Sequence, residues 1–119
     1  MDIKALDNAL QGIIKKREEL AKLNYNDPKY DDIEEQLHDL EDAFQVSYGE
    51  DMEEVLQDVH DEWCPDSDVL MPIAYVGKGI FVESEKFPDQ DTKLTLVANP
   101  PRLILIIGKD KQEILWTAK

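Results

Sequence analysis

The chain contains one cysteine, Cys64, among its 119 residues, so it cannot form an intramolecular disulfide. It has no apolar run approaching the ~20 residues that a membrane-spanning helix needs. Its N-terminus opens with an acid and lacks the continuous apolar stretch of a signal peptide. These absences predict a cytoplasmic protein that folds without disulfides and stays outside the membrane.

Residues that carry catalysis are also scarce. The sequence has two histidines and no Gly-x-Ser-x-Gly, His-Glu-x-x-His or dinucleotide-binding fingerprint. Gly77-Lys78-Gly79 is too short for a phosphate-binding loop and leads into a strand-like run, which favours a hairpin turn. We therefore expect a protein that is not an enzyme, with no catalytic residue and no cofactor.

One short segment could still hold a metal ion. His60 and Cys64 stand four residues apart, on one side of a predicted helix, and Asp66 and Asp68 follow closely. Imidazole, thiolate and carboxylate groups are ligands for zinc and other transition ions. A small metal-binding protein or enzyme is therefore a third hypothesis, behind the two developed below.

Basic residues are few and unevenly placed. The chain has 13 Lys and Arg against 27 Asp and Glu, a net charge of −14. Residues 27–68 hold 17 acids and the single base Lys29, whereas the segments on either side are each close to neutral. Such a field repels nucleic acid and anionic membranes and attracts basic partners. The simplest reading is a solvated helix face, and the alternative is a mimic of nucleic acid that binds a basic protein.

The first half of the chain has helical periodicity. Apolar residues spaced by three and four predict a helix over 2–23, a break at 24–28, and a second helix that runs from Tyr30 to Phe44. A short loop between two such helices predicts an antiparallel hairpin. Beyond Gly49 the apolar stripe resumes from Met52 to Trp63, which indicates a third helix or a bent continuation of the second.

After Asp68 the pattern changes to short β-branched runs divided by Gly and Pro. We expect five strands, at 70–76, 80–85, 93–98, 102–108 and 112–117. Their short connections predict an antiparallel meander, and Pro72 places the first strand at an edge. The fold class is therefore α+β, a single domain over 1–119 with a helical part at 1–65 and a β part at 69–119.

The strand around Leu103 to Ile107 is apolar on both of its faces. Helices would cover one face, and the other would need a second copy of the chain, a curled sheet or a bound target. The helical hairpin is also longer than a small sheet can cover. Our first hypothesis is therefore a homodimeric, non-catalytic protein-interaction or assembly module that binds neither nucleic acid nor membrane. The interface candidates are Leu10, Ile14, Trp63 and Trp116.

Overall fold

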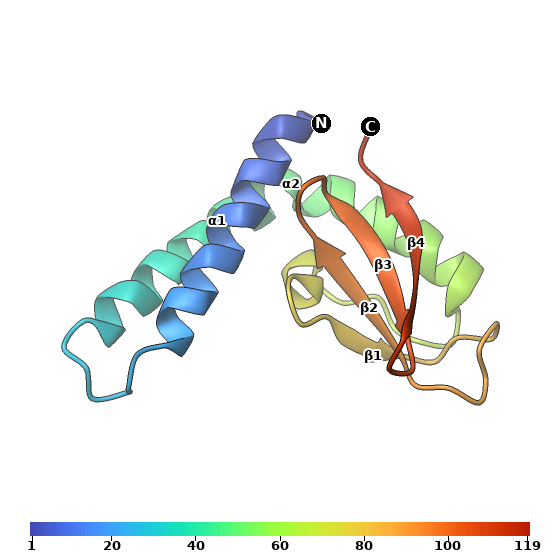
Figure 1. The fold of residues 1–119 in the computed structure, drawn as a ribbon. Coiled ribbons are helices and arrows are strands. Elements are labelled where there is room, and N and C mark those ends of the chain that lie inside the picture. Colours follow the sequence, from blue (N-terminus) through green and yellow to red (C-terminus); the bar gives the residue numbers. More distant parts are fainter.

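The computed structural model describes all residues, 1–119, and it begins with a helical hairpin (Figure 1). Helix α1 spans Ile3–Ala21 and helix α2 spans Tyr30–Trp63. The Asp2 carboxylate accepts a hydrogen bond of 3.0 Å from the Ala5 N–H, which caps the start of α1. The Asp27 carboxylate accepts one of 2.9 Å from the Lys29 N–H in the turn between the helices. The predicted hairpin is confirmed.

Helix α2 is one continuous element of 34 residues, and it bends near its middle (Figure 1). Of the two interpretations of residues 52–63, the continuation of the second helix holds, and a separate third helix was wrong. Gly49 is buried inside α2, where an added Cβ would overlap the Gln45 amide. This glycine therefore admits a neighbouring side chain and does not end the helix.

Arg17 joins the hairpin to the rest of the molecule. Its guanidinium donates to the carbonyls of Val76 and Ile73, and it lies 3.0 Å from the Glu41 carboxylate. Lys16 donates to the Gln36 side chain at 2.9 Å, a further contact between the two helices. The side chain of Arg17 takes the place of an apolar residue in the helix seam because it reaches these partners.

The strand predicted at 70–76 was wrong. This segment forms a short 3-10 helix, η1 (Pro72–Tyr75), and only Val76 makes an isolated parallel bridge, to Leu96. Pro72 stands in the first turn of η1, where its missing N–H costs no hydrogen bond. The Tyr75 hydroxyl is drawn inward to His60, which folds the segment back onto α2.

Four strands form the sheet, in the order β1 (Ile80–Val82), β2 (Thr92–Val97), β3 (Arg102–Ile107) and β4 (Lys111–Thr117). Each pairs antiparallel with the next, so the predicted meander is confirmed with four strands in place of five. At β4 the pairing shifts: Leu103 pairs with Trp116 but Ile104 pairs with Ile114, which leaves Leu115 as a bulge. Because of the bulge, Ile114 and Trp116 point to opposite faces of the sheet.

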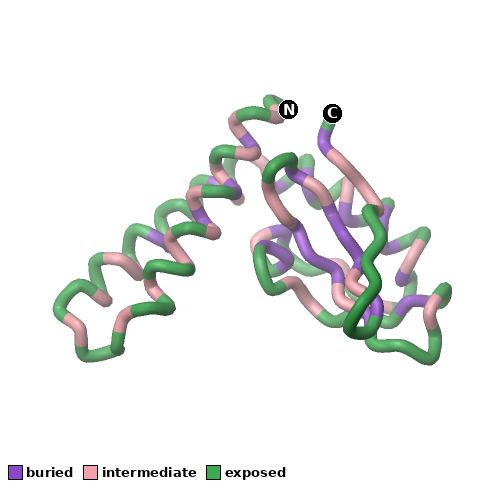
Figure 2. The backbone as a smooth tube through the Cα atoms, in the orientation of Figure 1, coloured by how far each residue is buried: buried purple, intermediate pink, exposed green.

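The core lies between one face of the sheet, the second half of α2 and the first half of α1. Figure 2 shows the buried residues gathered there, while the far end of the hairpin is mostly exposed or intermediate. The molecule measures 46 × 31 × 23 Å, an elongated outline. Neither α1 nor α2 combines the length and apolar character required to cross a membrane.

Candidate protein-interaction surface

The sheet has one covered and one uncovered face. Leu103, Leu105 and Ile107 of β3 point to the core and are buried. Ile104 and Ile106 alternate with them and so point the other way. Figure 1 views the sheet from this other side, with α2 behind it and no helix in front. We call this side the open face.

The open face is largely apolar. The register of the sheet places five apolar residues on it, and none of them belongs to the core cluster. Phe81 is 75% exposed and Ile114 is 62% exposed, whereas Ile104 is only 8% exposed because its neighbours on the sheet surround it. The five are Phe81, Val97, Ile104, Ile106 and Ile114. Exposed apolar residues grouped in this way mark a binding surface more often than an ordinary solvent face.

The charged residues that strand pairing places on the open face are both basic, although Glu83 and Asp91 lie near Phe81 at its edge. Its charged residues are Lys93, whose ammonium lies 5.2 Å from the centre of the Phe81 ring, and Arg102. Arg102 donates to the carbonyls of Ala98 and Pro100 at 2.9 and 3.0 Å. No Asp or Glu side chain lies on this face by the pairing register. A partner for this surface would therefore combine apolar and acidic groups.

A hollow of about 520 Å³ lies where the open face meets α1. Its walls come from α1 and from the turn after β2, and they include Ile14, Lys15 and Val97. The Asn99 N–H donates to the Asp7 carboxylate at 2.6 Å, which holds this turn against the helix. The apolar surface of the sheet thus continues onto the side of α1.

Helix α2 carries the opposite charge. Residues 30–63 include 14 Asp and Glu and no Lys or Arg. Two of these carboxylates lie within 4.0 Å of a basic nitrogen, Glu41 beside Arg17 and Glu62 beside Lys86. Val46, among the acids at the middle of the helix, is 88% exposed. The molecule therefore has an acidic helix and a mildly basic, apolar sheet face.

The residues considered for a metal site are not brought together as ligands. His60 is buried, with Nδ1 2.9 Å from the Ser67 carbonyl and Nε2 2.9 Å from the Tyr75 hydroxyl. Cys64 is also buried, and desolvation raises the pKa of its thiol to about 11. Asp66 and Asp68 are exposed. No group of three or more His, Cys, Asp or Glu side chains is placed to hold a metal ion.

The four interface candidates from the sequence lie in different surroundings. Leu10 is completely buried in the core, so it has no surface to offer a partner. Ile14 is partly buried and lines the hollow beside the sheet. Trp63 is partly buried beneath the ammonium of Lys86, 3.8 Å from the ring centre, and Trp116 packs partly on the core face. Of the four, Ile14 lies beside the open face, and Trp116 shares a hollow of about 670 Å³ with Ile114 at the edge of the sheet.

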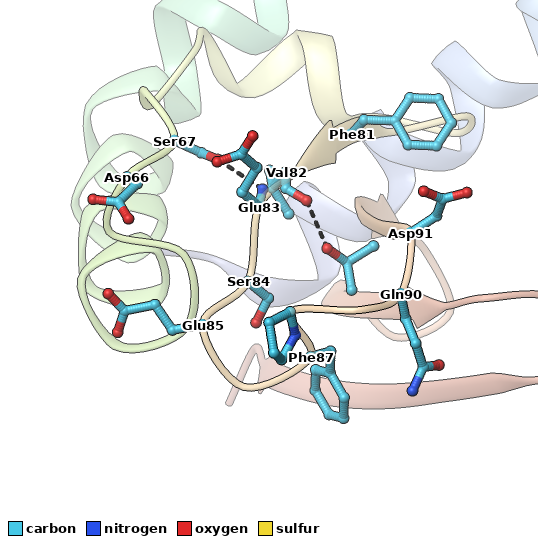
Figure 3. A pocket seen from close by; sticks show the side chains of 12 residues that line it. Asp66, Ser67, Phe81, Val82, Glu83, Ser84, Glu85, Phe87, Gln90 and Asp91 are labelled. Carbon is cyan, nitrogen blue, oxygen red and sulfur yellow. Dashed lines mark hydrogen bonds between the residues drawn. The ribbon is translucent and has the colours of Figure 1, made fainter.

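A cavity of about 960 Å³ lies between the β1–β2 loop and the segment after α2, and Phe81 of the open face is one of its lining residues (Figure 3). Two hydrogen bonds hold its wall: Glu83 N–H to Ser67 Oγ at 2.9 Å and Thr92 Oγ1 to the Val82 carbonyl at 2.6 Å. Its lining includes four carboxylates, Asp66, Glu83, Glu85 and Asp91, and no basic residue. These acids form no group of three that is placed to hold a metal ion.

Sequence reasoning missed most of the open face. The alternation of Ile104 and Ile106 with the core residues of β3 was visible, and it predicted an apolar second face. Ile114 could not be assigned to that face, because the bulge at Leu115 reverses the side on which β4 residues point. Phe81 is placed there by the register of β1 on β2, which the sequence does not contain. No protein-family model, curated protein or solved structure matches the chain significantly.

Proposed function

We propose that this chain is a non-catalytic protein-interaction module that binds its partner through the open face of the sheet. The observation that supports this is the grouping of Phe81, Ile106 and Ile114 on a face that no other element covers. Each such side chain contributes ~1.5–3 kcal/mol when a partner removes it fully from water. We place the module in the cytoplasm, and a second copy of the chain is its first candidate partner.

The composition of the face agrees with this role. Binding hot spots are rich in aromatic residues and arginine near a desolvated centre. Here Phe81 and Arg102 flank the isoleucines, and Lys93 lies over the aromatic ring. Because Lys93 and Arg102 are basic, the face would favour apolar partners that also carry acidic groups.

Site-specific photo-crosslinking tests the proposal. A photoreactive phenylalanine analogue at position 81 or 114 should give discrete protein adducts when the chain is irradiated in cell extract. The same analogue at Gln57, an exposed residue of α2, is the control. Absence of adducts at both 81 and 114, or equal adducts from position 57, would contradict the proposed role of the open face.

A second candidate function rests on the spacing of charge along α2. Fourteen carboxylates over 34 residues correspond to one charge per about 3.6 Å at the helical rise of 1.5 Å per residue. Phosphates lie ~3.4 Å apart along one strand of a duplex. Only two of these carboxylates, those of Glu41 and Glu62, lie within 4.0 Å of a basic nitrogen of the chain itself. The spacing and the scarcity of internal ion pairs favour an acidic mimic that occupies the nucleic-acid groove of a basic protein.

A further inference from the structure

The occupant of the open face can be deduced from three features of the molecule, of which the first is its shape. Residues 20–46, which we call the arm, form the end of the hairpin. Figure 1 shows the arm projecting to one side, away from the sheet, so that the sheet of the same copy does not cover it. The hollow lined by Ile14, Lys15, Glu18 and Val97 lies between α1 and the end of β2, beside the open face. The arm of one copy is therefore free to reach a second copy.

The second feature is charge. The α2 part of the arm, residues 30–46, holds seven acids and no Lys or Arg. Among the paired residues of the open face the charged ones are Lys93 and Arg102, both basic, while Lys15 and Glu18 of the hollow beside it have opposite charges. Two open faces packed on each other would set these basic residues near their own copies. An arm packed on an open face sets them near carboxylates, which is the complementary arrangement.

The arm also offers apolar groups among its acids. Val46 and Leu40 are among the exposed large apolar residues of the chain, as are Phe81 and Ile114 of the open face. Both surfaces therefore expose apolar side chains within a field of one sign, and the two signs are opposite. Apolar burial supplies the association energy in such contacts, and charge selects the partner.

The third feature is area. The four strands together have 22 residues, which cover about 350 Å² at ~3.3 Å per residue and ~4.8 Å between strands. One arm on one face would bury about 700 Å² in total, the size of a crystal contact, whereas two such contacts bury about 1,400 Å², within the range of stable interfaces. A two-fold axis supplies the second contact, because each copy then gives its arm and receives the other.

On the strength of the proposed function of the open face, we propose that the chain forms a two-fold dimer in which the arm of each copy lies on the open face of the other. The acidic arm meets Lys93 and Arg102, and the apolar residues of both surfaces lie between them. The arm thereby acquires a role that it cannot have within one copy, where its far end is exposed.

Sedimentation velocity between 1 and 100 µM tests this arrangement with two kinds of variant. Ile114→Lys alters the face, and Asp39→Lys with Asp42→Lys alters the arm. Each should weaken dimerisation at least about tenfold. Glu54→Lys with Asp58→Lys makes the same charge change on the same helix outside the arm, and it should leave the dimer intact. Phe81→Lys replaces Ile114→Lys if circular dichroism shows that the latter is unfolded.

Mixing the face variant with the arm variant gives the most specific result. Each variant alone lacks both contacts, but a mixed dimer keeps one contact, made by the intact arm on the intact face. The mixture should therefore associate more strongly than either variant alone, and more weakly than the wild-type chain, which has both contacts. A mixture whose association constant is no higher than that of either variant alone, while the wild-type chain dimerises, would overturn the reciprocal arrangement.

The remaining outcomes separate this inference from the proposed function. A wild-type chain that is monomeric at 100 µM overturns the dimer, while photo-adducts from positions 81 and 114 with another protein would still support the open face as a binding surface. If Ile114→Lys weakens the dimer and the arm variant does not, the reciprocal arrangement is overturned, but the open face is still supported as a binding surface. No dimer and no adducts would remove both.

Discussion

At the scale of single residues, the buried His60 and Tyr75 determine how the chain leaves α2. The Ser67 carbonyl can only accept, so His60 donates to it from Nδ1, and its Nε2 lies 2.9 Å from the Tyr75 hydroxyl. The Tyr75 oxygen also accepts from the Leu70 N–H at 3.0 Å. Both imidazole nitrogens therefore have a hydrogen-bond partner in the segment after α2, and this segment is held against the helix.

Tyr75→Phe should reveal the contribution of this network. The substitution keeps the ring but leaves His60 Nε2 and the Leu70 N–H without partners, and stranded buried groups cost ~1–3 kcal/mol in the free energy of unfolding. Urea unfolding followed by circular dichroism measures this loss. Tyr25→Phe removes the hydroxyl of an exposed tyrosine and should change stability little. Equal effects from the two variants would show that the buried hydroxyl is not stabilising.

At the scale of elements, periodicity predicted what regular packing produces. The hairpin and the run of three strands from β2 to β4 were predicted because their apolar residues recur at helical or strand spacing along one face. The strand prediction for residues 70–76 was wrong because the pattern from Leu70 to Val76 resembles a strand. The conformation of this segment depends instead on the hydrogen bond between the Tyr75 hydroxyl and His60, 15 residues earlier. A single-sequence pattern does not contain that long-range contact.

The open face shows the same division. The alternation of Ile104 and Ile106 with the core residues of β3 predicted an apolar second face. The positive charge of that face depends on which residues of β1, β2 and β3 lie side by side, and that follows from the register. The position of Ile114 depends on the bulge, which has no glycine or proline to mark it in the sequence.

Two glycines give a prediction about how tightly the elements pack. Gly79 precedes β1 with φ of +73°, and an added Cβ would overlap the Leu94 carbonyl and Thr95 Oγ1. Gly79→Ala should therefore lower the free energy of unfolding by about 2 kcal/mol or more. Gly12 lies within α1 with nothing near its Cβ position, so Gly12→Ala should raise it by ~0.5–1 kcal/mol.

Denaturant unfolding of both variants in parallel checks the opposite signs. The comparison is informative because the two substitutions add the same methyl group in different backbone environments. If Gly79→Ala were as stable as the wild-type chain, Gly79 would not lie as close to Leu94 and Thr95 of β2 as the structure places it.

At the scale of the whole molecule, the charge is separated rather than spread. The acids gather on α2, and the sheet half, residues 69–119, is close to neutral, with six acids against seven bases. Such separation orients approaching molecules over distances near the Debye length of ~8 Å at physiological salt. The two candidate functions use different sides of this arrangement, the open face in one and the outer surface of α2 in the other.

The outer surface of α2 therefore supplies a test of nucleic-acid mimicry that is independent of the open face. If the helix acts as a mimic, the immobilised chain should retain basic proteins from cell extract at ~0.1 M salt, and duplex DNA should displace them, because both would occupy one groove. The triple variant Glu50→Gln, Glu53→Gln and Glu54→Gln should lose this binding, since it removes three exposed charges and keeps the side-chain shapes. Ile114→Lys should retain it. Proteins that stay bound in the presence of DNA and to the neutralised helix would show that the carboxylates of α2 do not imitate phosphates.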